Sequence, residues 1–114
     1  MKLNWRGVIP AITTPFGDDL RIDHGFLAEH ARWMVDSGCI GVVPIGSLGE
    51  GATLTATEKR QVLETCVRAV GDQVPVIPGI SALSTAEAVA LARDARQIGC
   101  RGLMVLPPYV YCTD

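Results

Sequence analysis

Short runs of apolar residues alternate with longer amphipathic segments along this chain of 114 residues. The apolar runs cover residues 7–15, 40–45, 74–80 and 103–106, and they do not alternate with polar residues at every second position. Continuous apolar runs of this length are typical of parallel strands that are covered on both faces. We therefore predict four parallel strands.

Three longer segments between the apolar runs predict helices. We expect these helices at residues 23–37, at about residues 56–70, and from Ser84 to Gly99. In the first, Asp23 is the expected N-cap and Gly38 is the stop signal. Apolar residues fall on one side of this helix, and they are Phe26, Leu27, Ala31, Trp33 and Met34.

The second and third helices begin with the sequence pattern of a capping box. Thr55 is followed by Glu58, and Ser84 is followed by Glu87. In such a box the hydroxyl accepts a hydrogen bond from the third helical amide, and the carboxylate accepts one from the cap amide. The resulting order of strands and helices predicts a parallel sheet with right-handed crossovers.

An internal repeat indicates how large the complete fold is. The pattern Gly-Cys-x-Gly occurs at residues 38–41 and again at residues 99–102. Two strand–helix units separate the copies, so each unit takes roughly 30 residues, and eight would make the roughly 250 residues of a (β/α)₈ barrel. We predict an α/β fold of this kind, a TIM barrel. Residues 1–114 would be the amino-terminal part of one such domain, with about the first four strands and three helices.

An incomplete barrel would leave two open sheet edges and part of its core exposed. Two alternatives to an enzyme barrel therefore stay open. The alternative architecture is an open, doubly wound sheet of four strands. A half-barrel that associates with another chain and has no activity of its own is the non-enzymatic alternative.

Composition and charge narrow the possible partners. The net charge is −2 and the arginines are dispersed, which argues against a nucleic-acid partner. No apolar run approaches the roughly 20 residues that span a bilayer, and the start of the chain lacks a signal-peptide pattern. We therefore expect a cytoplasmic protein with no membrane partner.

Several residues that often carry chemistry are interpreted here as packing residues. None of the cysteines forms a C-x-x-C pair or has a histidine at metal-ligand spacing, so we expect buried thiols in a reducing compartment. The two histidines are six positions apart on the first helix, a spacing that does not suit a shared site, so we expect surface or helix-packing residues. The residues in this group are Cys39, Cys66, Cys100, Cys112, His24, His30, Trp5 and Trp33.

The most informative motif lies where the second apolar run ends, in Val42–Glu50 (VVPIGSLGE). Ligand sites of α/β proteins lie at the carboxyl ends of parallel strands. Gly46 and Gly49 allow the backbone to approach a ligand closely, and Ser47 offers a hydroxyl beside amides that can turn toward an anion. The motif predicts recognition of a small anionic group such as a carboxylate. A plain strand-to-helix turn is the alternative.

Hydroxyl groups also lie at the ends of the other three predicted strands, the first of which ends in a polar turn. They belong to Thr13, Thr14, Ser81, Tyr109 and Tyr111. Because strand ends converge in a barrel, these groups would surround one pocket, and hydroxyls suit carboxylate binding and proton relay. Carboxylates are few at these positions, which argues against a metal site or two-carboxylate chemistry. We expect no metal and no cofactor.

Three segments resemble one enzyme family over essentially the whole chain. Residues 13–16 (TTPF), 46–55 (GSLGEGATLT) and 107–109 (PPY) are similar to the dihydrodipicolinate synthase and N-acetylneuraminate lyase family. The resemblance implies a (β/α)₈ barrel, usually a tetramer or another homo-oligomer. It also implies a lyase or aldolase in which a lysine forms a Schiff base with pyruvate or another 2-oxo acid.

The resemblance also implies roles for individual residues. Ser47 matches the first hydroxyl of the family's G-[ST]-T-G-E motif and is implied to bind the substrate carboxylate or relay a proton. Gly46, Leu48 and Thr13 are the other implied substrate-binding residues. Tyr109 matches the first tyrosine of a P-Y-Y turn and is implied to be catalytic, with a rim or interface aromatic as the alternative.

Glu50 matches the glutamate of the same motif. We interpret it as a structural carboxylate that satisfies amides of the turn, and not as a catalytic group. Two further positions depart from the family pattern, because Leu48 stands where a second threonine is frequent and Val110 stands where synthases have a second tyrosine. Both changes make the site more apolar. A hydratase-aldolase that acts on a less polar 2-oxo acid is therefore an alternative.

The chain has only two lysines, Lys2 and Lys59, and neither suits a Schiff base. Lys59 follows a capping box next to Arg60, which predicts a solvated position remote from the strand ends. The resemblance implies a nucleophile on a later strand, beyond Asp114. We expect the 114-residue chain to be inactive by itself. A barrel that binds phosphate or flavin is the remaining enzymatic alternative.

Overall fold

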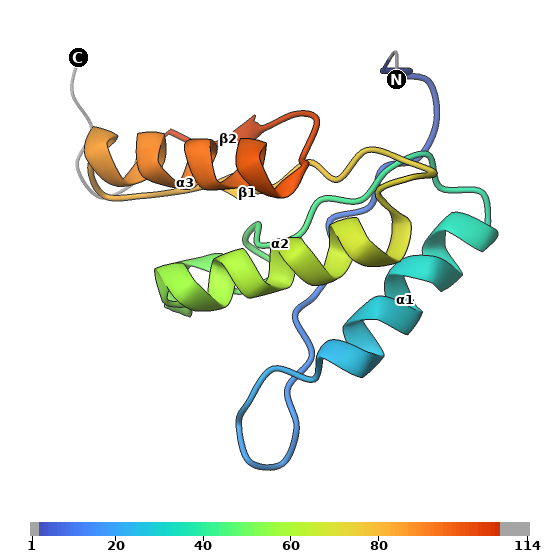
Figure 1. The fold of residues 1–114 in the computed structure, drawn as a ribbon, viewed down its shortest axis with the longest axis horizontal. Helices are drawn as coiled ribbons and strands as arrows, with labels where there is room; N and C mark the ends of the chain where they lie inside the picture. Colours follow the sequence, from blue (N-terminus) through green and yellow to red (C-terminus); the bar gives the residue numbers. More distant parts are fainter. Residues whose placement is uncertain (1–2, 108–114) are drawn as a thin grey trace.

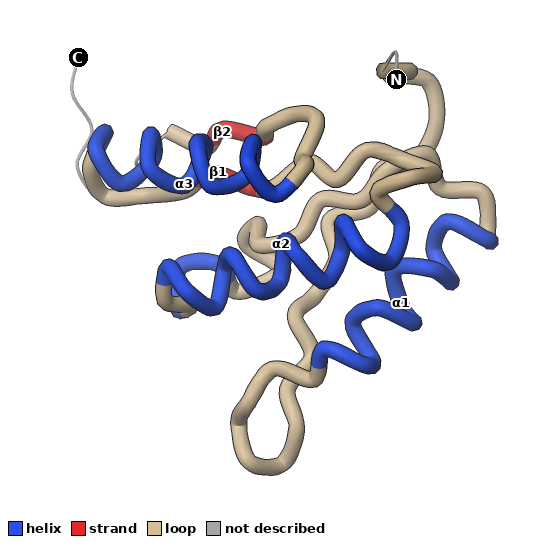
Figure 2. Tube along the Cα trace, in the orientation of Figure 1, coloured by secondary structure: helices blue, strands red, loops and turns tan. Residues whose placement is uncertain are grey.

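The computed structural model describes residues 3–107 of the protein. Helix α2 lies between α1 and α3 and contacts both, and the strands lie beside α3 (Figures 1 and 2). Within residues 3–107, no helix has the length and apolar character needed to cross a membrane. The elements in chain order are α1 (His24–Asp36), the 3₁₀ helix η1 (Gly51–Thr53), α2 (Ala56–Val70), β1 (Gly79–Ile80), α3 (Thr85–Ile98) and β2 (Met104–Val105).

The four predicted strands lie side by side in chain order, as a barrel requires. Strand β1 pairs with β2 in parallel. Single parallel bridges join Ala11 to Val43 and Val42 to Val76. Backbone hydrogen bonds of 2.8–3.2 Å connect each neighbouring pair. We call these the first, second, third and fourth strand segments, at residues 8–12, 40–44, 75–80 and 101–106.

The regular strands are much shorter than the predicted ones, and proline explains the difference. Proline has no amide hydrogen, so it cannot donate to a sheet ladder. Four prolines nevertheless each accept one ladder bond from the neighbouring segment through the carbonyl oxygen. Pro10 accepts from the amide of Val43, Pro44 from that of Gly79, Pro75 from that of Val42 and Pro78 from that of Met104. The segments are therefore correctly placed, but only two residues of each of the last two form a regular strand.

The predicted helices agree closely with the observed ones. The Asp23 side chain caps α1 by accepting from the Phe26 amide at 3.0 Å. Both bonds of the predicted capping box are present at Thr55 and Glu58. The second predicted box is half wrong, because Ser84 accepts from the Glu87 amide but no reciprocal bond is formed. The Glu87 side chain instead lines a cavity between α2 and α3.

The hydrophobic core fills the space between the three helices and the sheet. Leu27 and Ala31 bury one face of α1. The expectation that Trp33 and Trp5 are packing residues is wrong for this chain, because both are more than half exposed. Phe26 is exposed as well, beside His30 at the flank of α1. His24 fulfils its predicted packing role, with Nδ1 2.7 Å from the Thr65 hydroxyl of α2.

The cysteines follow the prediction in part. Cys66 is fully buried on α2, whereas Cys39 and Cys100 are half-buried, and all three are free thiols. Burial raises the pKa of Cys66 to about 12 and that of Cys100 to about 11. Cys112 lies outside the described residues. Both raised values favour the neutral thiol, as expected for packing residues.

Candidate functional site

A tight turn follows the second strand segment, and we call residues 46–51 the strand-end turn. The amide of Gly51 donates to the Gly46 carbonyl, and that of Glu50 donates to the Ser47 carbonyl, each at 3.1 Å. The backbone is left-handed at Ile45, directly before the turn, with φ of 54°, and at Glu50 within the turn, with φ of 56°. This conformation is rare for a β-branched residue such as isoleucine. Backbone strain of this kind is concentrated at functional sites.

The strand-end turn contains three backbone amides that have no acceptor within residues 3–107. Among the residues that the structure describes, the amides of Ser47, Leu48 and Gly49 donate to no protein acceptor. The Ser47 side chain is exposed and its hydroxyl makes no hydrogen bond within the same part of the chain. Successive free amides form a concavity that favours an anion. The turn can therefore receive a carboxylate through backbone amides and one hydroxyl.

The strand-end turn touches the other three strand segments. A Cβ atom placed on Gly49 would lie 3.1 Å from the carbonyl oxygen of Ile12, in the first segment. One placed on Gly79 of β1 would lie 2.8 Å from the Gly46 Cα, and one on Gly46 would lie 3.5 Å from the Met104 Cε of β2. Glycine is required at 79 because the neighbouring atoms belong to the backbone. The structure thus gathers all four segments at the turn.

The two threonines after the first segment have different environments. Thr13 is exposed, whereas Thr14 is buried and its hydroxyl donates to the Gly49 carbonyl at 2.6 Å. Successive side chains of an extended segment point to opposite sides, so only one of the two can face the solvent. Sequence reasoning placed both near the pocket and assigned substrate binding to Thr13. It missed the hydrogen bond of Thr14, because alternation indicates that one of two successive side chains is buried but not which distant group that side chain meets.

The structural role predicted for the Glu50 carboxylate is wrong. Glu50 is exposed, and its side chain makes no capping bond to the 3₁₀ helix η1 that follows. The backbone carbonyl of Glu50 instead accepts hydrogen bonds from the amide and the hydroxyl of Thr53, the last residue of η1. The short helix η1 was itself not predicted. It brings the chain from the strand-end turn to Thr55, the cap of α2.

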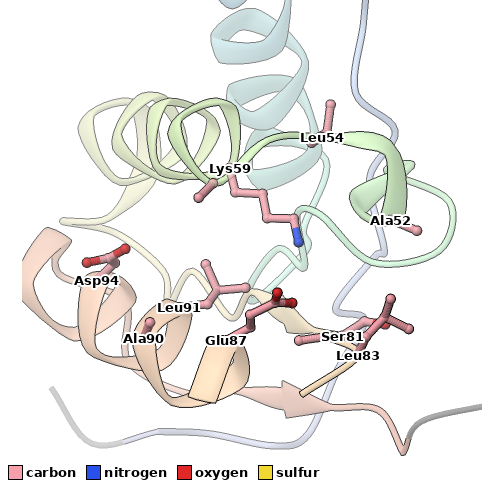
Figure 3. A pocket seen from close by; sticks show the side chains of 11 residues that line it. Ala52, Leu54, Lys59, Ser81, Leu83, Glu87, Ala90, Leu91 and Asp94 are labelled. Atoms are coloured by element: carbon pink, nitrogen blue, oxygen red, sulfur yellow. The ribbon is translucent and has the colours of Figure 1, made fainter. Parts of the chain in front are cut away.

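A cavity of about 460 Å³ lies beside these strand ends, between α2 and α3 (Figure 3). Ser81, which follows β1, lines it together with Lys59 of α2 and Glu87 of α3. Figure 3 shows the Lys59 amine pointing into this space. The prediction that Lys59 lies remote from the strand ends is therefore wrong. The capping box fixes where α2 begins, and this start turns Lys59 toward α3.

The tyrosines predicted at the site follow the fourth strand segment in the sequence. Tyr109, Tyr111 and the departing residue Val110 lie outside the described residues. The role of Tyr109 therefore stays a prediction. Leu48, in contrast, is described and is 65% exposed at the strand-end turn.

Comparison with known proteins gives this geometry a context. The sequence profile of the dihydrodipicolinate synthetase family matches residues 4–114. A curated relative, 4-hydroxy-tetrahydrodipicolinate synthase of Natronomonas pharaonis, is 47% identical over 103 residues. That alignment covers 90% of this chain and 35% of the relative. The chain therefore spans about a third of the length of the curated relatives that it matches.

Solved structures agree in fold. Dihydrodipicolinate synthase from Aquifex aeolicus superimposes with a TM-score of 0.87 at 33% identity, over 92% of this chain and 36% of that one. YagE from Escherichia coli K12, solved in complex with pyruvate, gives 0.91 at 28% identity, over 96% and 37%. These neighbours support the predicted barrel, of which this chain forms a part. The chain belongs to the dihydrodipicolinate synthetase family.

Proposed function

We propose that a full-length protein carrying this sequence is a lyase or synthase that forms a lysine Schiff base with pyruvate or another 2-oxo acid. The observation that carries the proposal is the strand-end turn, with three free amides and the Ser47 hydroxyl at the carboxyl end of a parallel segment. Such a site suits the carboxylate of a 2-oxo acid. The relative YagE, solved with pyruvate, supports this substrate class.

In the proposed mechanism the strand-end turn binds the substrate carboxylate and thereby orients the neighbouring keto carbon. A lysine supplied by a later strand attacks this carbon, and loss of water gives the imine. The protonated imine then withdraws electrons while a carbon–carbon bond is made or broken. Ser47 and Tyr109 would relay protons, and Thr13 and Gly46 would line the substrate site. The active form would be a homo-oligomer, a dimer or a tetramer.

Leu48 favours a second candidate, a hydratase-aldolase that acts on a less polar 2-oxo acid. Its exposed side chain adds apolar surface beside the proposed carboxylate site and provides no hydroxyl. Substituting Leu48→Thr would restore the hydroxyl that is frequent in the family. If the apolar candidate is right, this variant should lose specificity for substrates with apolar chains while retaining pyruvate binding.

Reductive trapping tests the proposal directly. The full-length protein is treated with pyruvate and borohydride, and its mass is measured. We expect an irreversible mass gain on one lysine that lies outside this sequence. The Lys59→Arg variant serves as a control and should be labelled equally, because Lys59 lines the neighbouring cavity and is not the proposed nucleophile. A folded protein that gains no mass would contradict the Schiff-base mechanism.

The same trapping experiment tests the isolated chain. The 114 residues contain only Lys2 and Lys59, so we expect no labelling by pyruvate and borohydride. Labelling of Lys59 in the isolated chain would contradict both this expectation and the assignment of the nucleophile to a later strand. Peptide mapping after digestion identifies which lysine carries the added mass.

A further inference from the structure

Thr14 differs from every other polar residue of the described chain in its burial. It is 6% exposed and is the one buried polar or charged side chain identified among residues 3–107. A buried hydroxyl is unfavourable unless it is hydrogen-bonded. Here the hydroxyl donates to the Gly49 carbonyl over 2.6 Å, within the range of a good O–H···O bond. This bond joins the end of the first strand segment to the strand-end turn.

The bond acts on a turn that is tightly constrained on its other sides. A Cβ atom on Gly49 would lie 2.9 Å from the Ile45 nitrogen, so the backbone at these two positions is in close contact. Ile45 itself is held with a positive φ. Such a conformation persists only when the surrounding structure determines it. The Thr14 hydroxyl supplies one of these constraints, at the residue that carries the last of the three free amides.

We infer that Thr14 is a positioning residue, whose buried hydroxyl holds the Gly49 carbonyl so that the free amides of the strand-end turn are preorganised for the substrate carboxylate. This inference rests on the proposed function. Thr14 does not contact the substrate and takes no part in the chemical step. Loss of its hydroxyl would leave the Gly49 carbonyl buried without a donor, and the turn would shift to satisfy that group.

Variants of the full-length protein separate the hydroxyl from the volume of the side chain. Thr14→Val keeps the shape and removes the hydroxyl, whereas Thr14→Ser keeps the hydroxyl and removes a methyl group. We expect Thr14→Val to raise the KM for pyruvate by roughly tenfold. The kcat should change by less than about twofold. Thr14→Ser should keep a KM close to that of the wild type.

A second pair covers the case in which Thr14→Val does not fold. Thr14→Ala and Thr14→Ser have similar volumes and differ chiefly by the hydroxyl, so a higher KM for Thr14→Ala supports the inference. Val62→Ala, in the core of α2, controls for loss of stability alone and should leave the KM for pyruvate unchanged. A KM that follows stability across all of these variants would overturn the positioning role.

Trapping of the wild type distinguishes this inference from the proposed function. If pyruvate and borohydride label no lysine of the folded wild-type protein, the proposed function fails and the inference fails with it. If the wild type is labelled but Thr14→Val and Thr14→Ala both keep the wild-type KM, only the positioning role of Thr14 is overturned. Labelling of the wild type together with the expected KM pattern supports both.

Discussion

The inner and outer pairs of strand segments have similar sequences but very different environments. Both pairs are largely apolar, and every residue of the inner pair except Ile40 is buried. In the outer segments, Val8 and Val105 are each 65% exposed, and Leu103 is exposed as well. Ile12 is the exception among these exposed residues of the outer segments, because its side chain is buried in the core cluster. The buried residues of the inner pair include Val42, Val43, Val76, Ile77 and Ile80.

This contrast shows that the neighbours of a strand, more than its composition, determine its burial. Within residues 3–107, the first and fourth segments each have a paired segment on one side only. Unpaired apolar edges favour association with further strands, and a closed barrel removes them. The relatives that this chain matches are about three times as long, since the chain covers about 35% of each. We propose that further strands of a full-length protein cover both edges.

Glycine substitutions should give the largest difference between an inner and an outer segment. Gly79→Ala would place a methyl group 2.8 Å from the Gly46 Cα and 3.1 Å from the Ile45 carbonyl oxygen. Because both atoms belong to the backbone, we expect a loss of about 3 kcal/mol in the free energy of unfolding. Urea denaturation of the full-length protein measures this loss.

Gly102→Ala is the matched control in the fourth segment. Its added methyl group would meet the Ile77 side chain at 3.4 Å, which is an ordinary contact. We expect a change below about 1 kcal/mol in the same measurement. Equal losses for the two variants would contradict the close backbone packing at the strand-end turn.

Valine truncations test whether the outer segments become covered. Val42→Ala removes two methyl groups from a fully buried inner position, and we expect a loss of about 2 kcal/mol. Val105→Ala should cost a similar amount in the full-length protein, although this side chain is exposed in the 114-residue chain. Denaturant unfolding of both variants gives the two values.

The result for Val105 decides between barrel closure and an open edge. A loss below about 0.5 kcal/mol in the full-length protein would mean that Val105 stays exposed there. The proposal that further strands cover this edge would then be wrong, whatever the result for Val42.

Much of the fold follows from local sequence signals. The helix bounds were predicted within about one residue, because Asp23, Thr55 and Ser84 are strong capping residues that act within one turn. The strand lengths were not predicted correctly. Hydrophobicity indicates where a chain is buried, whereas Pro10 and Pro44 decide where a ladder can be regular. Apolar runs alone therefore overestimate the length of the regular strands.

The site was less predictable than the fold. The motif at Gly46–Glu50 located the strand-end turn, since glycines after an apolar run are a local signal. The direction of the Lys59 side chain and the hydrogen bond from Thr14 to Gly49 depend on packing between segments far apart in the chain. Alternation and capping patterns describe neighbouring residues only. They cannot specify which distant carbonyl a buried hydroxyl will meet.

The smallest expected effect is a change in the free energy of unfolding with pH. It can be compared between Cys66, a thiol of the inner core, and Cys100, a thiol beside an outer segment. Desolvation by burial, with a smaller contribution from nearby Cys100, raises the pKa of Cys66 to about 12 from an ordinary value of 9.0. Burial likewise raises the pKa of Cys100 to about 11. The folded state therefore holds these protons more tightly than the unfolded state. Their contribution to stability is complete below pH 9 and is lost as the pH rises from there toward the folded values.

At pH 9 the Cys66 thiol is half ionised in the unfolded state and neutral in the folded state, so it should lower the free energy of unfolding by about 0.4 kcal/mol relative to pH 7. Comparing the wild type with Cys66→Ala at both pH values isolates one thiol from all other titrating groups. The variant should lose about 0.4 kcal/mol less than the wild type over this interval. An identical pH dependence would mean that Cys66 ionises as readily in the folded chain as in the unfolded one. Cys100→Ala should give a smaller difference at pH 9, because Cys100 is only half-buried and the pKa of its thiol is raised less, to about 11.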